Sequence, residues 1–181
     1  MSDEAVIRYS QTWATDDRVP PPLRGGERET LTAFLDKARR TFELKCLDLT
    51  SEQLSRTAVP PSDLSLHGLA RHLAAGERWW FRIQFAGEDV PMLHYSDAWP
   101  DQDFEDLAGD PEDALRLWRE ECAASRRIVA AATSLDDTGT RQRDGAAFSL
   151  RWLLPYVLEE YARHSGHADL LRERLDGRTG H

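Results

Sequence analysis

Apolar residues recur at intervals of three and four along four long segments of the chain, residues 27–46, 65–87, 110–132 and 149–177. This spacing places them on one face of an α-helix. Such faces are stable only when they bury one another, and the intervening segments show no convincing pair of strands. The pattern therefore predicts an all-α fold, a four-helix bundle with long crossover loops.

Proline and glycine divide the chain into an arm and a bundle. Three prolines and two glycines between positions 20 and 26 predict an irregular N-terminal arm over residues 1–26. The rest, residues 27–177, is predicted to form a single bundle domain. Long connections are expected at 48–63 and 88–109, and the segment 136–148 is predicted to be a polar loop or a short hairpin.

Composition excludes several classes of function. The net charge of −9 and the pI of about 5.1 argue against nucleic acid and anionic lipid as partners, because both need a positive surface. No apolar run has the length of a membrane span, and the first ten residues lack the pattern of a secretory signal. Cys46 and Cys122 lie far apart at apolar helical positions, which predicts reduced core thiols and a cytoplasmic protein.

The fourth segment carries polar residues where a bundle helix needs apolar ones. Glu160 and His164 are one helical turn apart on its apolar face, and His167 lies about 60° beyond His164. A buried carboxylate is costly unless a positive charge meets it. The pattern therefore predicts either an ion pair between Glu160 and His164 or a cation that both residues bind.

The second segment offers a matching ligand. His72 borders its apolar face, whereas His67, about 140° round the helix, should point elsewhere. One ligand from this helix and two from the fourth can converge inside a bundle. Two imidazoles and a carboxylate suit zinc, nickel, iron(II) or manganese with open positions for water or substrate. The alternative is that each histidine is a hydrogen-bonded core residue, and that an acid–base pair four residues apart is a surface ion pair.

A run of aromatic and basic residues follows in the second segment. Trp80 and Ile83 continue its apolar face and are expected to pack in the core. Arg78 and Arg82 lie on another face and are expected to form an exposed, solvated row rather than a binding site.

Two stretches of the chain resemble a known family. Residues 66–81 (LHGLARHLAAGERWWF) resemble the second-helix signature of the DinB-like superfamily, and residues 149–173 resemble its fourth helix. The mini-circle-protein-like actinobacterial branch is the most similar. The resemblance implies a four-helix bundle with a metal triad of His72, Glu160 and His164. The mycothiol-dependent maleylpyruvate isomerase is similar in using glutamate at the position of Glu160.

The same resemblance implies a reaction. Relatives use the metal with a low-molecular-weight thiol such as mycothiol. For this chain, zinc is the metal expected first, with nickel, iron or manganese as alternatives, and the expected substrates are small electrophiles. The expected activity is a metal-dependent thiol S-transferase or isomerase, and homodimers are possible. His167 and Tyr156 are candidates to orient or protonate the substrate, and Tyr156 stands where branch relatives often have a histidine. Tyr95 and Trp99 are expected to cover the pocket. The alternatives are a metal-binding or partner-binding bundle without turnover, and a metal-assisted hydrolase.

Overall fold

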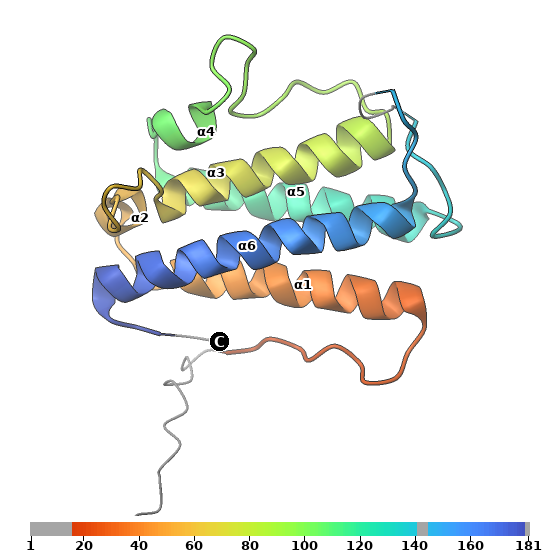
Figure 1. The fold of residues 1–181 in the computed structure, drawn as a ribbon, viewed down its shortest axis with the longest axis horizontal. Helices are drawn as coiled ribbons and strands as arrows, with labels where there is room; N and C mark the ends of the chain where they lie inside the picture. Colours follow the sequence, from red (N-terminus) through yellow and green to blue (C-terminus); the bar gives the residue numbers. More distant parts are fainter. Residues whose placement is uncertain (1–15, 141–144, 180–181) are drawn as a thin grey trace, which may run out of the picture.

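The computed structural model describes residues 16–140 and 145–179, and its long elements are all helices (Figure 1). They are α1 (Glu27–Cys46), α3 (Leu66–Glu77), α5 (Pro111–Ala131) and α6 (Leu150–Asp176). The prediction of an all-α bundle is confirmed. Within the described residues, β structure is limited to two isolated bridges, one of which joins Thr138 to Ser149. The predicted loop or hairpin at 136–148 is thus a loop with one bridge, and its residues 141–144 lie outside the described part.

The bundle is made of two helix pairs that pack face to face. α1 packs along α6, and α3 packs along α5, so that α3 and α6 lie side by side at one face of the molecule (Figure 1). Aromatic and aliphatic side chains fill the space between the pairs. Phe42 of α1 meets Trp118 of α5 with ring centroids 5.3 Å apart, edge to face. The face shared by α3 and α6 therefore joins two helices that are distant in the sequence.

At the start of α3, α5 and α6, a side chain accepts a hydrogen bond from a free backbone N–H group. The Ser65 hydroxyl accepts from the Gly68 N–H at 3.0 Å, and the Ser149 hydroxyl accepts from the Trp152 N–H at 3.3 Å. Asp110 caps α5, whose first residue is a proline. These caps determine where α3 and α6 begin, and hence which turn of each helix carries a given histidine.

The second amphipathic segment changes its winding after Glu77. It continues to Phe85, but residues Arg78–Phe85 form a π-helix, η1. π-helical winding fits one extra residue into the turn, and it is frequent near functional sites. Trp80, Phe81 and Ile83 are buried there. The expected core positions of Trp80 and Ile83 are thus confirmed, although the sequence predicted a uniform α-helix.

The expectation that Arg78 and Arg82 form an exposed row is wrong. The Arg78 guanidinium donates to Glu121 Oε1 at 2.6 Å, and Arg82 donates to the same oxygen at 3.0 Å and to Glu88 at 2.6 Å. Only 13% of the Arg78 side chain and 22% of the Arg82 side chain are exposed to solvent. Glu121 of α5, which is 2% exposed, holds both arginines at the interface between η1 and α5.

Two short helices lie in the long connections. α2 (Ser51–Ser55) stands where the sequence predicts a crossover loop, and α4 (Gln102–Glu105) lies over α3 in the connection 88–109 (Figure 1). The Arg71 guanidinium donates to the Gln102 carbonyl at 3.2 Å, which ties α4 to α3. This connection is therefore held against the helix that carries His72.

A buried polar cluster joins all four long helices. Arg39 of α1 donates two hydrogen bonds of 2.8 Å to Glu77 of α3. The Tyr161 hydroxyl of α6 donates to Glu77 at 2.8 Å and accepts from the Trp118 indole of α5 at 2.8 Å. Burial alone would raise the pKa of Glu77, but the adjacent Arg39 outweighs burial and lowers it. The cluster sets how α6 is placed against α3.

Both cysteines are buried and form no disulfide, as the sequence predicts. Burial raises the pKa of the Cys46 thiol to about 12. No helix in the described part of the chain is long and apolar enough to cross a membrane. The division into an arm and a bundle domain stays a prediction, since most of the arm lies outside the described residues.

Candidate metal centre

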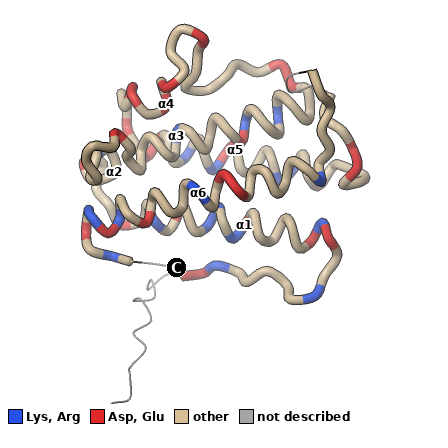
Figure 2. Tube along the Cα trace, viewed as in Figure 1, with Lys and Arg blue, Asp and Glu red and all other residues tan. Residues whose placement is uncertain are grey.

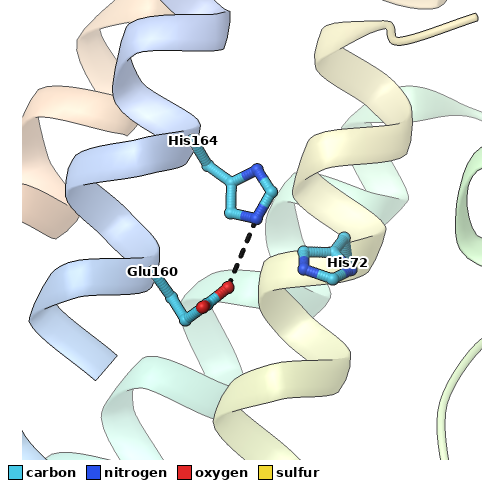
Figure 3. A group of neighbouring side chains, drawn as sticks. All are labelled: His72, Glu160 and His164. Atoms are coloured by element: carbon cyan, nitrogen blue, oxygen red, sulfur yellow. Dashed lines mark ion pairs between the residues drawn. The ribbon is translucent and has the colours of Figure 1, made fainter. Parts of the chain in front are cut away.

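The fold brings His72 of α3 together with Glu160 and His164 of α6 (Figure 3). One ligand atom from each of the three side chains lies within 4.8 Å of the others. His164 Nε2 is 3.5 Å from Glu160 Oε2, and the rings of His72 and His164 are 4.7 Å apart at 60°. The group lies on the face where α3 and α6 are neighbours. Three potential ligand atoms therefore surround one point between two helices.

His164 has the protonation state that a metal ligand needs. The residue is 8% exposed, and burial, followed by repulsion from His72 and His167, lowers its pKa to about 4. At neutral pH its imidazole is uncharged and keeps a free lone pair. The His164 ring thus cannot neutralise the Glu160 carboxylate beside it by forming an ion pair at neutral pH. Arg163 Nη2 lies 3.7 Å from Glu160 Oε1, but its side chain is 56% exposed, where solvent weakens the pair, so the carboxylate can still bind a metal cation.

Asp103 of α4 is a partner of His72 that the sequence did not reveal. Its carboxylate is 2.7 Å from His72 Nδ1, and the residue is 7% exposed. A carboxylate at Nδ1 holds the proton there and leaves Nε2 free to face the triad. The stretch around Asp103 contains several acidic residues without periodicity, so nothing in the sequence distinguishes it from its neighbours.

The two candidates for substrate orientation occupy different places. His167 Nδ1 is 3.3 Å from His164 Nδ1, so one of these nitrogens donates to the other. Tyr156 lies one turn before Glu160 in an aromatic group, stacked on Trp152 with ring centroids 4.8 Å apart and 4.6 Å from Trp80. His167 is thus placed to orient a triad residue, and Tyr156 packs over the start of η1.

A cavity of about 400 Å³ opens beside His72. Its walls come from α3, η1 and the connection 88–109, and include Trp79, Tyr95 and Phe104. The Phe104 ring stacks on His72 with centroids 5.0 Å apart. Of the two aromatic residues expected to cover the pocket, Tyr95 lines the cavity, whereas Trp99 is 40% exposed and donates to Glu105.

The other two histidines that the structure describes, His67 and His94, lie away from the triad. His67 is buried under α2, where its Nδ1 is 3.1 Å from the Ser55 hydroxyl, in line with the expectation that it points elsewhere. His94 lies in the connection 88–109, and burial lowers its pKa to about 4. His181 is outside the described residues.

The donor chemistry of the triad fits a divalent metal. Two neutral imidazoles and one carboxylate are a common set for zinc, iron, nickel and manganese, and three protein ligands leave positions open. Asp103 and His167 add the outer hydrogen bonds that metal-binding histidines usually have.

Comparisons with known proteins identify the family of this chain. A family model described as mycothiol-S-transferase matches residues 30–177. A solved structure, a conserved protein of a locus from Enterococcus faecalis, is similar with a TM-score of 0.60 and 15% identity, over 86% of this chain and 100% of that chain. At this identity it supports the fold alone. No curated protein matches the chain. Because the family model covers most of the chain, the resemblance to DinB-like proteins is confirmed, and the chain belongs to the mycothiol-S-transferase family.

Proposed function

We propose that this protein is a metal-dependent S-transferase that joins a low-molecular-weight thiol of the mycothiol type to a small electrophile. The observation that carries the proposal is the convergence of His72, Glu160 and His164 in a chain of the mycothiol-S-transferase family. Zinc is the metal that we expect, and His72, Glu160 and His164 would hold it. S-transfer is preferred to isomerisation because the family description names S-transfer.

The reaction needs a thiolate at neutral pH. A divalent metal in the triad would supply it by lowering the pKa of a coordinated thiol, which is otherwise about 8.5. The thiol sulfur then forms a bond to the electrophilic carbon, the leaving group departs with its bonding electron pair, and the thiol proton passes to solvent. Sulfur and carbon keep their electron count, so no oxidant or reductant takes part.

The protein's own residues orient the reactants. Asp103 fixes the His72 ring, and His167 fixes the His164 ring, so both imidazoles keep one orientation through the reaction. The cavity beside His72 would hold the electrophile between aromatic walls. Tyr156 and His167 are proposed to orient or protonate the substrate, with His167 the better placed of the two.

Metal analysis of the purified protein tests the site. We expect about one divalent metal ion per chain, lost in His72→Ala and in His164→Ala. The matched control is His94→Asn, which removes a histidine outside the triad at a position with φ of 48°, a conformation that asparagine tolerates. Full metal content in both triad variants would overturn the site.

A conjugation assay tests the reaction. The metal-loaded protein should accelerate the coupling of mycothiol to a bimane electrophile above the uncatalysed rate, and the triad variants should not. If metal binds at the triad and no thiol is consumed with any electrophile, the protein is a metal-binding bundle without turnover. If an ester is hydrolysed without a thiol, it is a hydrolase.

A further inference from the structure

The cavity beside His72 is lined by aromatic rings and carboxylates. Three aromatic rings, Trp79, Tyr95 and Phe104, share its walls with the carboxylates of Asp101 and Asp103. Among the residues that the structure describes, no lysine or arginine lines it. From this, and resting on the function proposed above, we infer that the cavity selects electrophiles that are uncharged or positively charged and rejects those that carry a carboxylate.

The segment over the cavity strengthens this selection. The connection 88–109 contains seven acidic residues and no lysine or arginine. Figure 2 shows acidic positions and no basic ones along this segment above α3. Glu88 is paired with Arg82, and Asp106 lies 3.9 Å from Arg71. The other five acidic residues still leave the segment with a net negative charge, which attracts cations and repels anions.

The nearest arginines do not cancel this charge at the cavity. Arg71 is 6% exposed, and its guanidinium lies against α4, 3.2 Å from the Gln102 carbonyl and 3.9 Å from Asp106. Arg78 donates to Glu121 at 2.6 Å. Arg78 also donates to the Pro91 carbonyl at 3.1 Å, but neither arginine lines the cavity, whereas Asp101 lines it and is exposed.

The aromatic walls suit the same substrates. Aromatic faces carry partial negative charge and bind organic cations as well as flat apolar groups. A volume of about 400 Å³ admits a molecule of one or two rings. An anionic electrophile in the cavity would meet repulsion from the carboxylates of Asp101 and Asp103. The inference also argues against isomerisation of a carboxylate substrate at this site.

Three electrophiles of one scaffold test the inference with mycothiol as the thiol. They are benzyl bromides with a para methyl, a para carboxylate and a para trimethylammoniomethyl group. Each is attacked at the same carbon with loss of bromide. The enzymatic kcat/KM is divided by the uncatalysed rate constant to remove intrinsic reactivity. At low ionic strength we expect the cationic and neutral compounds to exceed the anionic one by at least about tenfold.

Reversing the charge of one cavity residue tests whether the cavity causes the preference for cationic over anionic electrophiles. Asp101→Lys should shift the ratio of cationic to anionic turnover at least about fivefold toward the anion. Asp89→Lys is the matched control, because Asp89 is an exposed residue of the same connection that does not line the cavity. It makes the same change in the charge of the connection without altering a cavity wall, so it measures the general field of the segment, whose effect on the ratio should stay below twofold, within about 0.4 kcal/mol.

Binding without turnover separates this inference from the proposed function. The corresponding benzyl alcohols, which cannot react, are titrated into the metal-loaded protein by calorimetry. If they bind in the expected order but no bromide is turned over, the S-transferase proposal fails and the selectivity of the cavity stands. If turnover occurs with equal or higher preference for the carboxylate compound, or if none of the alcohols binds, the inference is overturned.

Discussion

Asp103 shows how a residue outside the triad can orient one of its histidines. Its carboxylate is 2.7 Å from His72 Nδ1 and nearly buried. It comes from a different element, α4, and it acts on the ring nitrogen that points away from Glu160 and His164. The orientation of His72 thus depends on a hydrogen bond across two segments of the chain.

We predict that Asp103→Ala weakens metal binding by about 10- to 100-fold, because His72 loses the partner that fixes its tautomer. Asp103→Asn keeps an acceptor and should lose less. The dissociation constant is measured by competition with a chelator, and the melting temperature of the metal-free protein is compared to exclude unfolding. Glu105→Gln neutralises another acid of α4 and should bind metal as the parent protein does. Equal affinity in the Asp103 and Glu105 variants would contradict this role.

His67 predicts a pH dependence of stability. Burial, followed by repulsion from Arg71, lowers its pKa below the usual value of 6.5. As the pH falls, His67 therefore takes up a proton at a higher pH in the unfolded chain than in the folded chain. The contribution of neutral His67 to stability is fully present above about pH 6.5 and is lost as the pH falls below this value. Urea unfolding between pH 7.5 and 5.5 should show a falling free energy.

A His67→Asn variant isolates this contribution. The fall in unfolding free energy should become shallower, by at most about 1.4 kcal/mol per pH unit, the limit for one proton. His94 and His164, whose pKa values are also lowered, would keep a residual slope. If the unfolding free energy of the variant depends on pH as steeply as that of the parent protein, the pKa of His67 is not lowered by folding.

Among the elements, the contact between α3 and α4 depends on a glycine. A Cβ atom at Gly68 would lie 3.1 Å from Phe104 Cδ1 and 3.4 Å from Phe104 Cα. These distances are tighter than ordinary contacts, so a larger residue would push α4 outward. Because Asp103 precedes Phe104, this displacement would also reach the hydrogen bond to His72.

We predict that Gly68→Ala weakens metal binding severalfold without unfolding the protein, since the helix preference of alanine offsets part of the clash. Gly76→Ala is the matched control, because the same change in the same helix meets open space. That variant should gain about 0.5–1 kcal/mol of stability and keep its metal affinity. Metal affinity that falls equally in both variants would count against the close contact as the cause.

At the scale of the whole molecule, the buried cluster around Glu77 links the four long helices. Arg39→Met leaves the Glu77 carboxylate buried without its main partner and should cost about 3–5 kcal/mol of unfolding free energy. The double variant with Glu77→Gln should recover part of this loss. Arg126→Met, which removes an exposed arginine paired with Asp36 at 2.8 Å, should cost less than about 1 kcal/mol in the same urea titration.

Metal binding should also stabilise the whole bundle, because the triad joins α3 to α6. At a hundredfold excess of zinc over its dissociation constant, the gain is about 2.7 kcal/mol, or roughly 5–10 °C in melting temperature. Calorimetry with zinc and after chelation measures the shift. His72→Ala should show none of it, whereas His94→Asn should show all of it. A shift of equal size in His72→Ala would place the zinc elsewhere.

The sequence by itself determined the four long helices and the triad's spacing along them. Glu160 and His164 are neighbours in one helix, so their separation follows from helical geometry without knowledge of the fold. The caps at Ser65 and Ser149 are equally local. The resemblance to DinB-like proteins then paired these residues with His72.

Only the tertiary structure decided the surroundings of the triad. The Asp103–His72 contact spans 31 residues, and the burial of Arg78 and Arg82 depends on Glu121 of another helix. The cavity's walls come from α3, η1 and the connection 88–109. Helical periodicity reports which face of a segment is apolar, but it holds no information on which distant segment covers that face. That choice follows from how whole helices pack, which is why Asp103 and the acidic cavity emerged only from the fold.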